Sequence, residues 1–222
     1  MNIHLYLCSV HKICQMGSTL IFAYMRTRDE NKIETIFRRT LEMIVKYGFD
    51  GFSMQKLARA AGVSPATIYI YFKSKEDLLL QLYQREKDRY FDYVLEGFDP
   101  RMDFATGLAA QWKRRAQFAI ENQDIAHFME HFTFTPLHLK SMKLHENRIG
   151  PVMSAFVHQA IENRELIPMP FEVYWSVAFA PLMNLIRFHK AGFNLHGDPF
   201  QLTDAMLMQT LSLVLKALKP EA

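Results

Sequence analysis

The chain has 222 residues and a formal net charge of +3, and half of its residues are hydrophobic. That length allows one large domain or two small ones, and the hydrophobic content can fill a core without help from disulfides or a metal. The two cysteines, Cys8 and Cys14, have no spacing typical of a disulfide framework or a zinc site, so a reducing cytosol, and hence a cytoplasmic location, is expected.

Residues 1–25 form an apolar N-terminal extension that lacks the features of a targeting segment. Lys12 comes too late to supply the basic start of a signal peptide, and the charge-free run from Ile13 to Met25 is too short to cross a bilayer as a helix. We therefore expect no membrane partner. We interpret the extension as a mis-called or dispensable leader before a natural start at Met16 or Met25. A genuine arm that packs on a neighbour or on DNA is the alternative.

A first long helix is predicted from about Asp29 to Tyr47, because apolar residues recur there every three or four positions. Basic side chains occupy its outer face, and Lys and Arg outnumber Asp and Glu between residues 25 and 90. A basic end on a nearly neutral chain fits a nucleic-acid contact surface, although an ordinary solvated face explains any single basic residue equally well. The glycines and aromatic residues at 47–52 predict a turn after this helix.

The next stretch is divided by capping residues into two short helices and the start of a third. Ser53 can cap the first helix, and Gly62 can end it in the left-handed conformation that glycine adopts without strain. Ser64 can cap the second helix with Pro65 at its first position, and Ser74 can cap the third. A short helix, a glycine turn and a second short helix form a helix-turn-helix, whose second helix enters the DNA major groove.

Three motifs in this stretch resemble the DNA-binding signature of the TetR family of bacterial transcriptional regulators: AAGVS at 60–64, IYIYF at 68–72 and KSKEDL at 73–78. A generic helix-turn-helix would share only the first motif. The resemblance implies an all-α protein with an N-terminal three-helix helix-turn-helix DNA-binding domain at 26–73. It also implies a C-terminal helical ligand-binding and dimerisation domain at 74–222.

The resemblance further implies nine residues that contact phosphates or base edges: Ser53, Gln55, Ser64, Pro65, Ala66, Thr67, Tyr69, Tyr71 and Lys75. Small side chains let the recognition helix enter the groove, and hydroxyls can reach phosphate oxygens or base edges. Lys75 is expected at a phosphate close to a helix N-terminus, where the helix dipole favours an anion. Family members often carry His at the position of Tyr71, so the chain departs from the pattern there.

From residue 74 onward the sequence predicts helices only, without strand patterns or internal repeats. A connecting helix is expected over 74–97, with a break at Asp99 and Pro100. Further helices are expected over about 104–121, 123–132, 136–166 with a break or kink at Pro151, 171–191 with a kink at Pro181, and 200–218.

Aromatic residues and methionines are abundant in this second region, and pockets between the helices of a bundle are common ligand sites. The resemblance implies a ligand sensor here, so a small apolar or aromatic effector is expected. The residues predicted to bind it are Trp112, Phe128, His131, Phe132, Trp175 and Phe179. Ordinary core packing is the alternative for each of them.

The last two predicted helices carry long apolar faces. In the TetR family the two C-terminal helices of each chain form a four-helix dimer interface, which implies a homodimer here. The residues predicted for that interface are Leu182, Leu185, Ile186, Leu207, Leu211 and Val214. Packing within the subunit's own core is the alternative.

One pattern points to a different chemistry. His127, Glu130 and His131 match H-x-x-E-H, in which two histidines bind zinc and the glutamate acts as a base. A peptidase would also need a third ligand and a larger catalytic frame, so we predict no metal, no cofactor and no catalytic residues. The prediction is a ligand-responsive repressor that binds a palindromic double-stranded operator. A helical metal-dependent or ligand-binding enzyme with an incidental helix-turn-helix is the alternative.

Overall fold

The computed structural model describes residues 29–144 and 147–220. These residues form helices and loops with an isolated bridge between Phe193 and Pro199 and no strand, which confirms the all-α class. They divide into two compact units, one that ends at Leu78 and one that begins at Leu79. The expectations for the extension at 1–25 fall outside the described residues. No helix in the described ranges has both the length and the apolar character needed to span a membrane.

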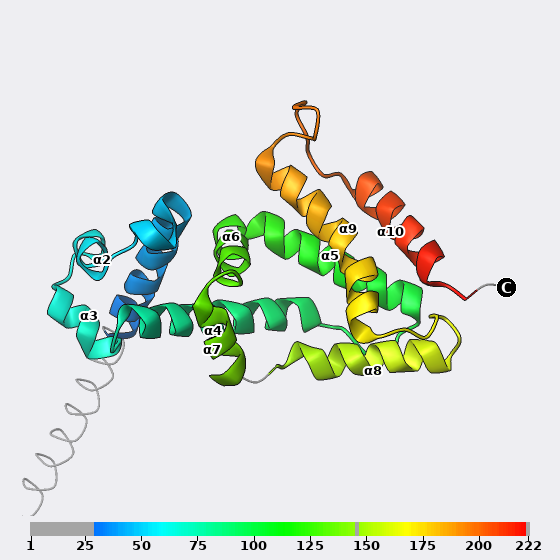
Figure 1. Ribbon diagram of the computed structural model, residues 1–222, viewed down its shortest axis with the longest axis horizontal. Helices are drawn as coiled ribbons and strands as arrows, with labels where there is room; N and C mark the ends of the chain where they lie inside the picture. The colour runs from blue at the N-terminus through cyan, green and yellow to red at the C-terminus, as the bar shows by residue number, and fades with distance from the viewer. Residues whose placement is uncertain (1–28, 145–146, 221–222) are drawn as a thin grey trace, which may run out of the picture. The chain divides into compact units, whose positions relative to one another are not determined.

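The first unit consists of the helix at residues 29–51, α2 (Met54–Ala61), α3 (Pro65–Tyr71) and the first turn of α4 (Lys75–Leu95) (Figure 1). The first helix continues past Tyr47, where the sequence predicts its end, to residue 51, and it includes Gly48 with a φ of +70°. The unit closes on aliphatic and aromatic side chains that are almost completely buried: Ile36, Ile44, Phe52, Leu57, Ile68 and Phe72.

The caps predicted from the sequence form in the structure. The Ser53 hydroxyl accepts a hydrogen bond from the Lys56 N–H at 3.3 Å, and the Ser64 hydroxyl accepts one from the Thr67 N–H at 3.1 Å. Gly62 ends α2 with a φ of +67°, a left-handed conformation that costs other residues about 1–2 kcal/mol. These interactions fix where α2 ends and where α3 begins.

The second unit contains the rest of α4, followed by α5 (Phe104–Glu121), α6 (Gln123–Phe132), α7 (Pro136–Leu144), α8 (Ile149–Glu162), α9 (Phe171–Ala191) and α10 (Asp204–Leu218). Helix α5 is central in this unit, because it packs against α6, α8, α9 and α10. Helices α9 and α10 lie side by side at the end of the chain (Figure 1).

Two prolines of this unit have different effects. The predicted break in the segment 136–166 is present between α7 and α8, but it lies before Ile149 and not at Pro151. Pro151 lies in the first turn of α8, where a backbone N–H has no intrahelical partner, so it does not break the helix. Pro181 lies inside α9 and removes one backbone hydrogen bond there. Close to it, the Trp112 indole N–H donates to the carbonyl of Ala178 at 2.8 Å. Trp112 therefore joins α5 to α9 beside the proline.

Candidate functional site

The N-terminal half of α3 lies at the surface of the first unit. Ser64, Pro65 and Ala66 are exposed and Thr67 is half-buried, whereas Ile68 is completely buried in the core of the unit. The hydroxyl oxygens of Ser64 and Thr67 lie 2.9 Å apart, so the cap also orients the Thr67 side chain. The start of α3 thus offers small side chains and two hydroxyls, which suits close approach to base edges and phosphates.

The neighbouring surface includes one residue that the sequence analysis missed. Gln55 and Tyr69 are exposed and Ser53 is half-buried, so all three are accessible to a ligand on this face of the unit. Ile70 is 76% exposed although it is a large aliphatic residue. The sequence could have indicated this residue, because Ile70 follows Thr67 by three positions and residues three apart share a helix face.

Two of the predicted DNA contacts are engaged inside the first unit. The Tyr71 hydroxyl donates to the Asp29 carboxylate at 2.8 Å, and this hydrogen bond raises the pKa of Tyr71. A phenol has a single proton to donate, so Tyr71 tethers α3 to the first helix instead of offering that proton to DNA. The Lys75 ammonium donates to the carbonyls of Phe49 and Phe52, both at 3.0 Å. It has a third donor, and its phosphate contact stays a prediction.

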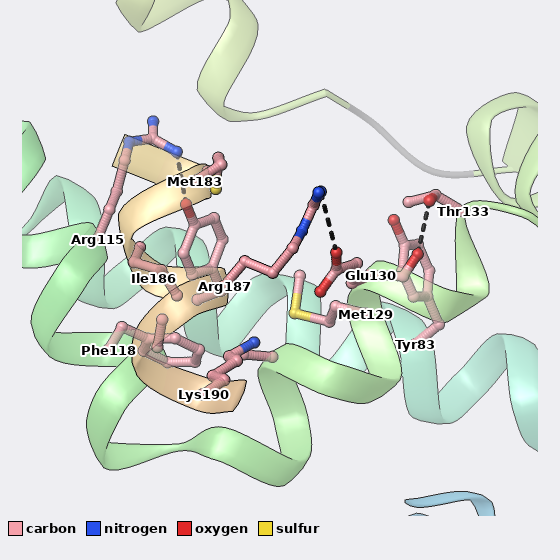
Figure 2. Close-up of a pocket in the computed structure, with 13 residues that line it drawn as sticks. Tyr83, Arg115, Phe118, Met129, Glu130, Thr133, Met183, Ile186, Arg187 and Lys190 are labelled. Carbon is pink, nitrogen blue, oxygen red and sulfur yellow. Dashed lines mark hydrogen bonds and ion pairs between the residues drawn. The ribbon is translucent and has the colours of Figure 1, made fainter. Parts of the chain in front are cut away.

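The second unit contains a pocket of about 410 Å³ that is lined by residues of α4, α5, α6 and α9. This volume falls within the range of sites that bind small molecules. Apolar side chains such as Phe118, Met129 and Ile186 line it, together with the basic residues Arg115, Arg187 and Lys190 (Figure 2). Figure 2 also shows Arg187 facing Glu130, with a closest nitrogen–oxygen distance of 3.9 Å.

Burial perturbs one of the basic groups in the pocket wall. Burial is the main cause that lowers the pKa of Lys190, and the nearby Glu130 carboxylate opposes this effect. Arg115 is only 3% exposed, and the sequence analysis did not single it out. The sequence could have indicated Arg115 as a buried charge, because it follows Trp112 by three residues and precedes Ala119 by four, and so lies on the same stripe of α5.

The residues predicted to bind an effector lie outside this pocket wall. Trp112, Phe128, Phe132 and Phe179 are almost completely buried, and their rings pack against other side chains of the core. The Trp175 ring packs against that of Phe179 in a tilted arrangement, with centroids 4.5 Å apart, and His131 is exposed on α6. The aromatic stripe is therefore mainly core, because the period of a helix identifies its apolar face but not whether a pocket adjoins it.

The two histidines of the H-x-x-E-H pattern are neighbours on α6. The ring centroids of His127 and His131 lie 4.2 Å apart, and burial is the main cause that lowers the pKa of His127. Within the described ranges no three metal-ligating side chains converge, at this pair or elsewhere.

Comparison with known proteins identifies the family. Residues 36–82 match the model of the bacterial regulatory proteins of the tetR family. An uncharacterised HTH-type transcriptional regulator of Haemophilus influenzae is 31% identical over 161 residues, which cover 72% of this chain and 84% of that relative. The chain belongs to the TetR family. All three motifs at 60–78 lie within the matched residues.

Solved TetR-family structures have the same fold. A TetR-family regulator from Marinobacter aquaeolei has a TM-score of 0.73 and 27% identity, over 88% of this chain and all of that chain. The transcriptional regulator FadR from Bacillus subtilis, solved in complex with stearoyl-CoA, has a TM-score of 0.64 and 16% identity. That match covers 83% of this chain and 98% of FadR, and at this identity it shows the fold alone.

Membership of the TetR family settles the broad class of function. This TetR-family protein is a DNA-binding transcriptional regulator with a helix-turn-helix, and it is not an enzyme. The alternative of a metal-dependent enzyme is therefore set aside.

Most of the residues predicted for a dimer interface lie in the core of the subunit instead. Five of them are buried among side chains of α5, α9 and α10, and Leu185 is half-buried; the five are Leu182, Ile186, Leu207, Leu211 and Val214. They face inward because α9 and α10 both pack on α5. The apolar residues that these two helices leave exposed are Val173, Met183, Met206, Met208 and Leu213.

Proposed function

We propose that this TetR-family protein is a repressor that binds a palindromic operator as a homodimer and is released by a small, largely apolar or aromatic effector. The main observation in support of this proposal is the exposed N-terminal half of α3. It presents Ser64, Ala66 and Thr67 at the surface, while Ile68 anchors the helix from below. Small residues permit entry into a major groove, and the hydroxyls can select among base edges.

A homodimer supplies the second recognition helix that a palindrome requires. Dimers of helix-turn-helix proteins bind half-sites whose centres lie about 34–36 Å apart, or a multiple of that distance. The exposed apolar residues of α9 and α10, which include Val173, Met183 and Leu213, are the proposed contact with the second copy. A two-fold interface uses the same patch on both subunits, so one such surface is sufficient.

The pocket in the second unit is the proposed effector site. Tyr83 and Tyr90 of α4 belong to its wall, and the same helix begins at Lys75 in the first unit. A ligand that shifts α4 would therefore act on a segment shared with the DNA-binding unit. The FadR structure contains stearoyl-CoA, which supports an amphipathic ligand for this fold. Release requires that effector and DNA favour different states, and their coupling is then reciprocal.

A gel-shift assay on the DNA upstream of the protein's own coding sequence tests this proposal. We expect a complex that withstands an excess of scrambled competitor and weakens with salt, because phosphate contacts release counterions. An effector should dissociate that complex. Equal competition by scrambled DNA would contradict the proposed operator.

A further inference from the structure

We propose that the effector is an organic acid, whose carboxylate pairs with Arg115 and whose hydrocarbon part fills the pocket. This inference rests on the proposed function of the pocket as an effector site. It goes further because it names the chemical class of the ligand and the residue that selects it.

Arg115 is a buried cation without a matching anion. Its side chain is almost completely buried, and among the described residues no carboxylate forms an ion pair with it. One guanidinium nitrogen, Nη1, donates to the Tyr90 hydroxyl, while Nε and Nη2 have no hydrogen-bond partner in the described part of the chain. A buried charge that is neither paired nor fully hydrogen-bonded is costly, so a partner that supplies negative charge would bind with a large gain.

The surroundings of Arg115 support the cation but do not neutralise it. The guanidinium carbon lies 4.6 Å from the ring centroid of Phe179 and 5.1 Å from that of Trp175. The faces of aromatic rings attract a cation, which explains how the side chain is held at this position. They offer no acceptor for Nε and Nη2, so two of the guanidinium nitrogens of Arg115 keep unused donors.

A second unused donor belongs to Tyr174, whose ring packs against Phe179, as the Arg115 guanidinium does. The Tyr174 hydroxyl is buried and has no hydrogen-bond partner among the described residues. Burial raises the pKa of Tyr174, although the charge of Arg115 opposes this effect, so the hydroxyl stays protonated. Arg115 lines the pocket and Tyr174 does not, so Arg115 is the group proposed to donate to the carboxylate of the ligand.

The rest of the pocket favours a single negative charge with an apolar body. Phe118, Met129 and Ile186 provide apolar wall, and the volume of about 410 Å³ is sufficient for a small amphiphile. The other charged residues in the wall are Arg187, Lys190 and Glu130. The single carboxylate, Glu130, lies 3.9 Å from Arg187 and also acts on Lys190, so it compensates these two cations and not Arg115. Arg115 is therefore the residue that should contribute most to a difference in affinity between an acid and a neutral compound of the same shape.

Binding of dodecanoate, compared with its methyl ester, tests the inference. Both probes are used below the micellar concentration, and binding is followed by calorimetry and by the fluorescence of Trp112 and Trp175, the only two tryptophans of the chain. We expect the wild-type protein to bind the acid at least about tenfold more tightly, because hydrogen bonds to a charged group are lost with the ester. Equal affinity for acid and ester would overturn the inference.

Variants assign the preference to Arg115. Arg115→Met should remove the preference for the acid while the ester still binds, which also shows that the variant is folded. Arg187→Met is the matched control, because it removes a cation of the same wall that already faces Glu130, and it should keep the preference. If Arg115→Met binds neither probe, the test uses Arg115→Lys, which keeps the positive charge. An Arg115→Lys protein that still prefers the acid supports the inference, and one that binds acid and ester equally overturns it.

Two further measurements separate this inference from the proposed function. Dodecanoyl-CoA has no free carboxylate at its acyl group, and its charges lie on the CoA part. Tight binding of this thioester without binding of dodecanoate would overturn the proposed pairing of a ligand carboxylate with Arg115. The gel shift on upstream DNA is run in parallel. Specific DNA binding without a preference for the acid would overturn this inference and leave the proposed function intact. Absence of specific DNA binding would overturn the proposed function.

Discussion

At the scale of single residues, the helix start at Ser64 combines two tasks. Its hydroxyl caps α3 through the Thr67 N–H and also lies 2.9 Å from the Thr67 hydroxyl. The same pair is therefore a structural cap and also part of the surface that we propose for DNA contact. Tyr71, at the other end of α3, is held by Asp29 of the first helix. Hydroxyls that are equivalent in the sequence motif thus have different roles in the structure.

Tyr71→Phe tests the role of the tyrosine hydroxyl. It removes the hydrogen bond to Asp29 and should lower the free energy of unfolding by about 1 kcal/mol, measured by urea denaturation. The salt dependence of DNA binding should be unchanged, because no phosphate contact is lost. A salt slope reduced by about 1 at unchanged stability would show instead that Tyr71 contacts a phosphate.

At the scale of elements, the short helices were predictable because their ends carry specific residues. Ser53, Gly62 and Ser64 define the helix-turn-helix through local backbone chemistry, and the structure has each of these caps. Pro151 was misassigned because the effect of a proline depends on its distance from the helix start. The sequence alone does not show where α8 begins, so it does not show that Pro151 lies in the first turn of this helix.

Gly62→Ala tests the turn between α2 and α3. Glycine has a φ of +67° here, and an added Cβ would meet no atom within 4 Å, so the cost is purely conformational. We expect a loss of about 1–2 kcal/mol in thermal or urea unfolding of the protein. Gly62→Asn is the control and should lose less, because asparagine tolerates this conformation better. Equal stability of Gly62→Ala and wild type would contradict a left-handed turn.

Trp112→Phe tests the contact between α5 and α9. The variant leaves the Ala178 carbonyl without the indole donor, which should cost about 1–3 kcal/mol of unfolding free energy. Trp175→Phe makes the same change of ring at a half-buried position and should cost less. Equal losses in the two variants would mean that the indole hydrogen bond contributes little.

At the scale of the whole molecule, the fold class and the helix-turn-helix followed from the sequence, but the pocket and the exposed apolar residues of α9 and α10 did not. Helical periodicity marks Leu207, Leu211 and Val214 as apolar without showing whether a core or a partner covers them. The structure assigns them to the core. The pocket could not be predicted for a related reason. One of its charged residues, Arg115, interrupts an apolar stripe of α5, and helical periodicity does not show that a pocket adjoins this stripe.

Leu213→Lys tests the proposed dimer face. Leu213 is 60% exposed on α10, so a lysine there should leave the isolated subunit folded while it places a charge in the contact. We expect a shift from dimer to monomer in analytical ultracentrifugation and a loss of operator affinity. Leu139→Lys, at a position of α7 that is 67% exposed, is the control and should stay dimeric. A Leu213→Lys variant that remains dimeric would place the interface elsewhere.

The measurement that tests the central claim most directly is a hydroxyl-radical footprint on the upstream DNA, with wild type and with Thr67→Ala. Two copies of α3 in successive major grooves predict two symmetric protected patches, whose centres lie about 10–10.5 base pairs or a multiple apart. Thr67→Ala should weaken these patches more than it weakens binding to random DNA, because base contacts carry sequence preference. A single patch, or uniform protection that the variant does not change, would contradict recognition by the exposed start of α3.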